Sequence, residues 1–154
     1  RARMPTPPEA VTAALLHDMG KVVLDEAMDN ATLTALRAAW ASSAQSRLEI
    51  ERQVLGLDHG ELGGYIARHW GLSERVAAAI THHHDPASAR SVICDVVHLS
   101  NGIAKLAGFG PLVAEIDGPI EGDVLARLSF SPGDLHTFCT DLIERMRTGQ
   151  ERFH

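Results

Sequence analysis

The sequence predicts an all-α protein, a compact bundle of several helices, and three observations lead to that class. Apolar residues recur at three- and four-residue spacing in successive segments, and helix-capping residues precede most of these segments. No alternating run of apolar and polar residues is long enough for a convincing strand. With 154 residues, 45% of them hydrophobic, the chain can bury one core, so we expect a single helical domain over residues 1–154.

The amino-terminal half begins with two helical stretches. The sequence Thr6-Pro7-Pro8-Glu9 combines a capping hydroxyl, proline at the first helical position and a glutamate three residues after the cap. The expected buried stripe of this first helix consists of Val11, Leu15 and Val22. A second stretch begins after Asn30, is weakened by serines at positions 42, 43 and 46, and recovers over residues 48–55.

A third helix is expected to begin at Asp58-His59-Gly60-Glu61 and to stop at Gly71. Its apolar residues follow one another at four-residue spacing, and we expect all of them to pack in the core: Leu62, Ile66 and Trp70. Its glycines could suggest a phosphate-cradling loop, but close packing against another helix explains them better: Gly60, Gly63 and Gly64.

The helix capped by Ser73 carries the next histidines. His83 and His84 lie seven and eight residues after Val76, so helical periodicity places both on or beside the apolar face. A longer helix from about residue 90 ends at Gly108 and presents an apolar stripe with a polar residue, Asn101, beside it. A short helix over residues 123–128 and a terminal helix from Asp134 complete the chain. The expected inward residues of the terminal helix are Leu135, Phe138, Leu142, Ile143 and Met146.

Composition excludes several classes of protein. The net charge of −6 and the scattered basic residues argue against direct binding of nucleic acid. No run of about 18 apolar residues and no signal-peptide pattern is present, so we expect a cytoplasmic protein without a membrane segment. Cys94 and Cys139 both fall in apolar helical patterns, which predicts buried free thiols in a reducing compartment.

Histidines and carboxylates recur beside apolar faces at four places: His17-Asp18, His59, His83-His84 and the polar position 101. Neutral imidazoles and carboxylates on rigid helices are ligands for divalent transition metals, which lower the pKa of a bound water. Each signal alone is weak, because a single inward histidine is more often a hydrogen-bonded core residue. Together they predict a present or ancestral metal site.

These residues also resemble a known family. The matching segments are Leu15-Leu16-His17-Asp18-Met19-Gly20-Lys21, then Glu51 through Leu57-Asp58-His59-Gly60-Glu61-Leu62-Gly63, then His69-Trp70-Gly71-Leu72-Ser73, and His83-His84-Asp85-Pro86. Their spacing is similar to that of the HDOD domain, a helical signalling branch of the HD phosphohydrolase superfamily that is common in bacteria. The resemblance implies an HD-like bundle and a regulatory module that acts beside other signalling proteins or domains.

The resemblance carries over to site residues one by one. His17 and Asp18 match the signature dyad, and Lys21 stands where catalytic relatives contact phosphate. The remaining matches are to the additional histidines of two-metal, cyclic dinucleotide-cleaving relatives: His59, His83 and His84. The candidate metal ligands are therefore His17, Asp18, His59, His83 and His84, for manganese, iron, zinc or magnesium.

Three departures from active relatives argue against catalysis. Asn101 stands where the final metal-binding aspartate is expected, and an amide oxygen does not neutralise metal charge. The Gly-Tyr-Pro signature after the paired histidines is replaced by Asp85-Pro86-Ala87-Ser88. No histidine precedes His17, so we expect that the chain lacks the family's amino-terminal helices and that its first helices expose an apolar face.

Two hypotheses follow. The favoured one is a non-catalytic signalling module with a degenerate metal pocket, in which the candidate ligands form an internally hydrogen-bonded polar network. The alternative is a metal-dependent phosphohydrolase acting on a nucleotide or phosphate ester, with catalytic roles for Asp18 and Lys21. Nucleotide sensing without turnover and a homo-oligomeric assembly are further possibilities that the residues leave open.

Overall fold

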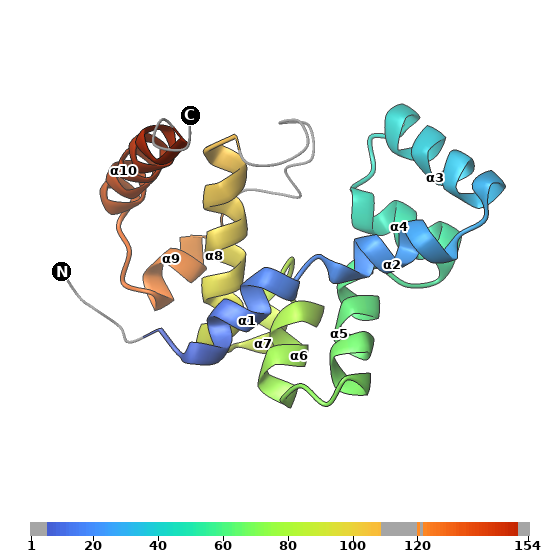
Figure 1. Ribbon diagram of the computed structural model, residues 1–154, viewed down its shortest axis with the longest axis horizontal. Coiled ribbons are helices and arrows are strands. Elements are labelled where there is room, and N and C mark those ends of the chain that lie inside the picture. Colours follow the sequence, from blue (N-terminus) through green and yellow to red (C-terminus); the bar gives the residue numbers. More distant parts are fainter. Residues whose placement is uncertain (1–5, 109–119, 121, 151–154) are drawn as a thin grey trace.

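The computed structural model describes residues 6–108, 120 and 122–150, and within them it is all-α. No strand occurs in these described ranges, which confirms the predicted class. The helices follow one another along the chain as shown in Figure 1: α1 Pro8–Leu16, α2 Met19–Ala27, α3 Asn30–Ser42, α4 Arg47–Leu55, α5 His59–His69, α6 Glu74–Thr81, α7 Pro86–Ala89, α8 Val92–Leu106, α9 Gly122–Arg127 and α10 Pro132–Gln150. Of the helices described, none combines the length and apolar character needed to cross a membrane.

The prediction of one amino-terminal helix with a single buried stripe is wrong, because this segment forms two helices, α1 and α2. The helical path breaks at His17 and Asp18, and three residues expected in the core, Val11, Leu15 and Val22, are 61%, 80% and 71% exposed. The buried face of α1 consists instead of small residues, Ala10 and Ala13, which pack against α6 and α8. Small side chains are buried there because they let helix axes approach closely, and the larger valine and leucine lie on the opposite face. The expected exposed apolar face of the first helices is therefore present.

The second predicted stretch is two helices, as its serines indicated. Helix α4 begins with a capping box, in which Ser46 and Glu49 each bond to the other's backbone N–H. It ends at Gly56, whose φ of +81° is a left-handed conformation that favours glycine. Helix α3 is capped by Asp29 and has only Leu36 fully buried, so it lies at one edge of the molecule, at the upper right of Figure 1.

Helices α5 and α6 pack closely against each other through glycines. A methyl group added to Gly60 would lie 2.8 Å from the Thr81 carbonyl oxygen, and one added to Gly64 would overlap the Thr81 hydroxyl. Gly63 faces Ile80 in the same way, so the predicted role of these glycines in close packing is confirmed. The caps at Asp58 and Ser73 and the stop at Gly71 are also present.

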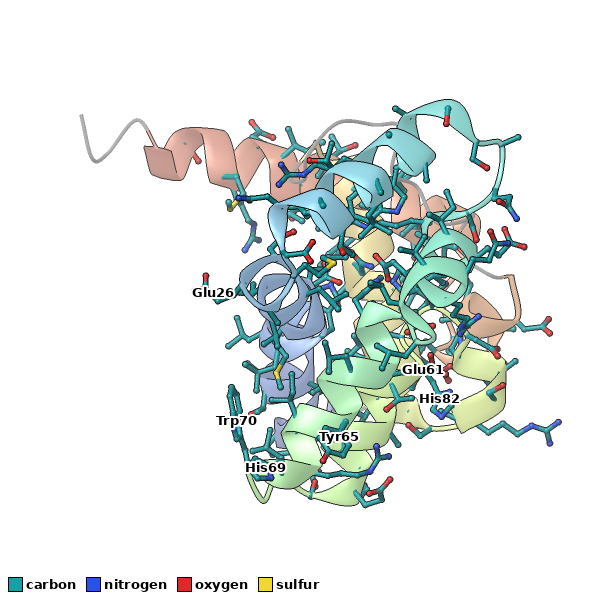
Figure 2. The ribbon with its side chains drawn as sticks, turned by 90° about the vertical axis from the view of Figure 1, so that its right-hand side faces the viewer. Glu26, Glu61, Tyr65, His69, Trp70 and His82 are labelled. Atoms are coloured by element: carbon teal, nitrogen blue, oxygen red, sulfur yellow. The ribbon has the colours of Figure 1, made fainter. Side chains whose placement is uncertain are left out.

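The predicted core position of Trp70 is wrong, and the glycine face of α5, formed by Gly60, Gly63 and Gly64, explains why. Trp70 is 61% exposed because α5 ends at His69 and its inward face is the line of small residues that meets α6. Trp70 and Tyr65 lie at the outer surface beside His69 in Figure 2. Leu62 and Ile66 are half-buried, so the larger apolar residues form the flank of the helix interface.

The carboxy-terminal helices pack around a second apolar cluster. Its buried members come from α8 and from the α9 segment: Leu99, Ile103, Val124 and Leu128. Helix α10 contacts this cluster through Leu135, Cys139 and Leu142, whereas Phe138, Ile143 and Met146 are 48%, 44% and 42% exposed. The predicted inward position of these last three is wrong, because the cluster covers only the face that carries Cys139. Cys94 and Cys139 form no disulfide; Cys94 is buried and Cys139 is half-buried.

Candidate metal centre

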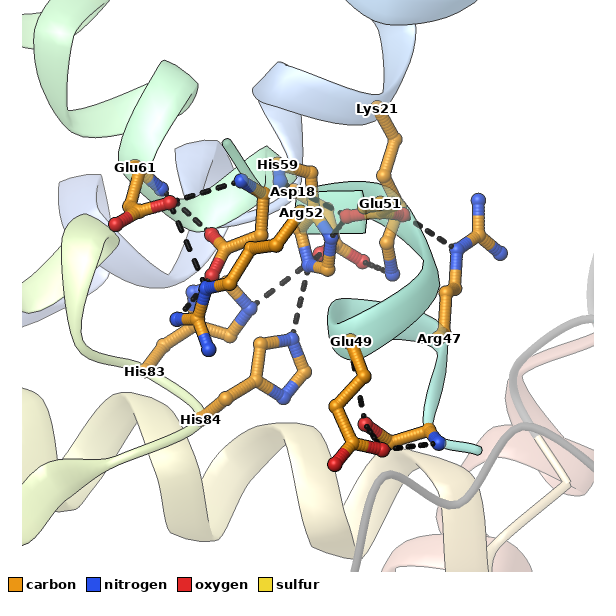
Figure 3. A network of polar contacts seen from close by, with 12 residues as sticks. Asp18, Lys21, Arg47, Glu49, Glu51, Arg52, His59, Glu61, His83 and His84 are labelled. Carbon is orange, nitrogen blue, oxygen red and sulfur yellow. Dashed lines mark hydrogen bonds and ion pairs between the residues drawn. The ribbon is translucent and has the colours of Figure 1, made fainter. Parts of the chain in front are cut away.

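Four side chains from distant parts of the sequence converge on one point. One ligand atom from each of Asp18, His59, His83 and His84 lies within 4.8 Å of the others, and we call this group the histidine pocket. Figure 3 shows its residues. The structure therefore brings together four of the five candidate ligands. The fifth, His17, adjoins the pocket through its Nε2 atom, 3.4 Å from Oδ2 of Asp18.

Each member of the pocket lies at the end of a helix. His17 and Asp18 form the break between α1 and α2, and His59 is the first residue of α5. His83 and His84 follow the end of α6 at Thr81, so the helical spacing that predicted them as inward applies to a turn beyond the helix. The packing of Gly20 against the His59 carbonyl oxygen draws the start of α2 onto the start of α5. These close approaches fix the distance between Asp18 and His59.

Hydrogen bonds orient two imidazoles toward Asp18. Nδ1 of His83 lies 2.7 Å from the Ile80 carbonyl oxygen, and Nδ1 of His59 lies 2.6 Å from Oε2 of Glu51. A carbonyl or carboxylate oxygen only accepts, so each Nδ1 carries the proton and each Nε2 keeps its lone pair. Both Nε2 atoms lie 3.5 Å from Oδ1 of Asp18. Nε2 of His84 lies 2.9 Å from that of His59.

Some polar atoms of the pocket are left without a hydrogen bond. Nε2 of His83 and Oδ1 of Asp18 are buried and have no hydrogen-bond partner among the described residues, and the same holds for Nε2 of His17 beside them. A buried polar atom without a partner costs about 1–3 kcal/mol. The internally hydrogen-bonded network expected from the sequence is thus incomplete, and it is incomplete at the atoms that face one another.

Electrostatics favour the protonation states that metal binding needs. Burial alone would raise the pKa of Asp18, but the imidazoles of His17 and His83 and the ammonium of Lys21 outweigh it, so the pKa lies well below its ordinary value. Burial lowers the pKa of His83, and burial together with the neighbouring imidazoles lowers that of His84. A charged carboxylate and neutral imidazoles are the ligand forms that bind a divalent ion.

His17 behaves differently from the other histidines. Burial lowers its pKa, but the adjacent Asp18 carboxylate and the Ala14 carbonyl outweigh that effect and raise it above the ordinary value. The negative charge of Asp18 therefore favours the protonated form of His17.

Lys21 and Asn101 stand in different relations to the pocket. Nζ of Lys21 lies 2.9 Å from Oδ2 of Asp18, so its charge is engaged by the outer oxygen of the same carboxylate. Asn101 is half-buried on α8, one turn after His98, whose Nδ1 donates to the His83 carbonyl oxygen. Among the described residues, the structure records no polar contact between Asn101 and the pocket.

Glu51 was not predicted to have a role, and it positions His59 in the pocket by hydrogen bonds. Its carboxylate is fully buried and accepts from both Nδ1 and the backbone N–H of His59. Burial alone would raise the pKa of Glu51, but His59 and Arg47 outweigh it, and the pKa is lowered. The role of Glu51 could have been inferred from its place beside Ile50 on the buried face of α4, because a buried charge needs a partner.

The residues present fit a metal ion. Three imidazole nitrogens and one carboxylate oxygen form a donor set that Zn²⁺ and other divalent transition metals accept. Two atoms of this set, Nε2 of His83 and Oδ1 of Asp18, are buried without a hydrogen-bond partner among the described residues and could contact such an ion. Glu51 supplies the second contact that ligating histidines usually make through their other nitrogen.

Comparison with known proteins identifies a family. The family model of the HDOD domain matches residues 1–86, which is more than half of the chain and includes the whole histidine pocket. No curated protein and no solved structure matched the sequence. The pocket, the capped glycine-rich helix α5 and the paired histidines after α6 all lie within the matched segment. The chain belongs to the HDOD family.

Proposed function

We propose that the protein is a non-catalytic signalling module of HDOD type that acts through contacts with other proteins or domains and holds one divalent transition-metal ion as part of its fold. The family supports the signalling role in general terms. The metal is proposed from the donor atoms of the histidine pocket, and the regulatory role from the features that separate the pocket from a catalytic centre.

One observation carries the metal proposal. Nε2 of His83 and Oδ1 of Asp18 are buried, lie 3.5 Å apart and lack hydrogen-bond partners among the described residues, although Nδ1 of His83 is bonded to the Ile80 carbonyl oxygen. A polar network built only for stability would leave fewer such atoms, because each one costs free energy. A bound cation would satisfy them together.

The number of ligands favours a structural ion. Structural zinc sites use four protein ligands, whereas catalytic sites keep a position open for water or substrate. The pocket offers four ligands, so an ion held by all of them has no position left in tetrahedral coordination. Such an ion would join the α1–α2 break, the start of α5 and the turn after α6.

A metal-dependent phosphohydrolase is the second candidate, and Lys21 favours it. The ammonium lies beside Asp18 on the outer side of the pocket, where it could stabilise the charge of a phosphate ester. Against this candidate stand the amide of Asn101 and the absence of a second group of metal-ligating residues from the described ranges. Two-metal hydrolysis needs a second ion about 3.5–4 Å from the first.

Elemental analysis and a hydrolysis assay distinguish the two candidates. We expect about one zinc, iron or manganese ion per chain, lost in Asp18→Ala and retained in His136→Ala, a control at an exposed histidine of α10. We expect no hydrolysis of bis(p-nitrophenyl) phosphate with added manganese. Metal content unaffected by Asp18→Ala would refute the metal site, and hydrolysis abolished by Asp18→Ala would favour the enzyme.

A further inference from the structure

We infer that the α3–α4 hairpin, residues 30–55, is a regulatory arm of the histidine pocket, coupled to it through the contact series Trp40–Arg47–Glu51–His59. This inference rests on the proposed metal binding and names how that binding would be regulated. Arg47 and Glu51 are positioning residues, because they act on the ion through His59.

The inner contacts join Glu51 to His59. Both side chains are fully buried, and Oε2 of Glu51 lies 2.6 Å from Nδ1 and 2.9 Å from the backbone nitrogen of His59. These bonds fix the orientation and the tautomer of the imidazole, so the lone pair of Nε2 is directed into the pocket.

The outer contacts join Glu51 to the surface helix α3. The second carboxylate oxygen, Oε1, accepts from Nε of Arg47 at 2.9 Å, as Figure 3 shows. The Arg47 guanidinium in turn lies over the Trp40 ring, 4.0 Å from its centroid. Because the two oxygens of one carboxylate are used on opposite sides, a shift of Arg47 changes the position of Glu51 relative to His59.

The outer helix of the arm, α3, is attached more weakly than the helices that carry the histidines. Leu36 is the fully buried residue of α3, and the helix is joined to α4 through a serine-containing segment, residues 43–46. Segments with few buried apolar contacts open at low free-energy cost. By contrast, α5 and α6 meet through the glycine face and carry the remaining histidines at fixed distances.

Coupling of this kind acts in both directions. If a bound ion strengthens the His59–Glu51 bond, it also stabilises the Arg47–Trp40 stack, and a partner that displaces Trp40 weakens metal binding by the same factor. The series therefore gives the module a physical means to convert contact with a partner at α3 into a change of pocket occupancy, or the reverse.

Zinc binding and Trp40 fluorescence test the inference in one experiment. The chain has two tryptophans, so Trp70→Phe, a change at an exposed position, leaves Trp40 as the single reporter. Zn²⁺ should shift the Trp40 emission of this protein in a saturable way. Competition with a chromophoric zinc chelator gives the affinity, and Glu51→Gln should weaken it by about 10–100-fold.

Two variants address the arm itself. Arg47→Ala should weaken zinc binding by about 5-fold or more, below the effect of Glu51, because it acts one contact further away. Trp40→Leu keeps the Arg47–Glu51 ion pair and should give a smaller loss, which covers the case in which Arg47→Ala does not fold. Arg68→Ala breaks an exposed ion pair between Arg68 of α5 and Glu74 of α6 and should leave the affinity unchanged.

The two possible failures are distinguishable. Zinc affinity equal in the reference protein, Arg47→Ala and Trp40→Leu would overturn the arm and leave the metal site standing. A Trp40 emission that does not respond to bound zinc would also contradict the coupling. Absence of zinc binding in the reference protein would overturn the proposed metal site, and the arm with it.

Discussion

The pocket half of the molecule and its carboxy-terminal end are built on different kinds of packing. Around the histidine pocket, helices meet through alanine and glycine, and added side chains would collide with backbone atoms such as the His59 carbonyl. At the other end, α8, α9 and α10 meet through leucine, isoleucine and valine, and α10 leaves several large apolar side chains half exposed. Small residues fix distances between helices more strictly than long flexible ones, so the site lies in the half whose geometry is least adjustable.

The largest effect that the comparison predicts is the loss of stability in Gly20→Ala, with Gly122→Ala as its control. Gly20→Ala would place a methyl group onto the His59 carbonyl oxygen, which is backbone and cannot rotate away. We expect a loss of about 3 kcal/mol or more in the free energy of unfolding. Gly122→Ala, at the start of α9, meets no atom of the described residues within 4 Å and should change stability by less than about 0.5 kcal/mol. Denaturant unfolding of both variants measures the difference, and equal losses would abolish the contrast.

The next effect concerns the one buried ion pair that joins α8 to α9 in the described structure. Asp95 is 2% exposed and accepts two bonds from Arg127, at 2.9 and 2.6 Å. Arg127→Ala should cost about 2–3 kcal/mol, below the usual range for a buried pair because Arg127 is itself partly exposed. The double variant Asp95→Ala, Arg127→Ala should recover part of that loss. A double variant no more stable than Arg127→Ala would contradict the view that the isolated carboxylate is the main cost.

A smaller effect is expected in the acid dependence of the pocket half. The folded-state pKa of Glu51 is below its ordinary value of 4.5, so its stabilising contribution is present above pH 4.5 and is lost as the pH falls through the folded value. The melting temperature in chelator should therefore fall less steeply below pH 4.5 in Glu51→Gln than in the unchanged protein. Glu26→Gln is the control, an exposed residue of α2 for which the described structure shows no bond to His59. Parallel curves for the unchanged protein and Glu51→Gln would show that Glu51 titrates as it does in the unfolded chain.

The smallest effect is at the exposed face of α10. Phe138→Ser removes a half-exposed ring whose neighbour is Phe130, with ring centroids 6.4 Å apart, and should cost no more than about 1 kcal/mol. Leu128→Ala, in the same apolar cluster but buried, should cost about 2–4 kcal/mol. Similar losses in the two variants would mean that α10 is packed as firmly as α9.

The sequence predicted the helical class, most helix boundaries and the convergence of Asp18 with His59, His83 and His84. These follow from local signals, such as the caps at Asp58 and Ser73, and from the spacing shared with the family. The failures have a common physical cause. Val11, Trp70 and Phe138 were assigned to the core by hydrophobicity, but the closest helix contacts are made by small residues on other faces.

The supporting role of Glu51 could not be read from the sequence for a different reason. It depends on a partner eight residues away across a turn, and a buried glutamate is visible in a sequence only when its partner is known. Glu51 lies in a segment that resembles the family, but the resemblance implied no role for it. The hydrogen bonds to His59 show that it positions this imidazole.

The central claim is that the histidine pocket binds a metal ion, and thermal unfolding with and without Zn²⁺ tests it most directly. An ion present at about 100 times its dissociation constant should stabilise the folded protein by about 2.7 kcal/mol. For a chain of this size that corresponds to a rise of roughly 5–11 °C in melting temperature relative to chelator. His83→Ala should lower the melting temperature and remove the response to zinc. An unchanged response in His83→Ala, or no response in the unchanged protein, would contradict the claim.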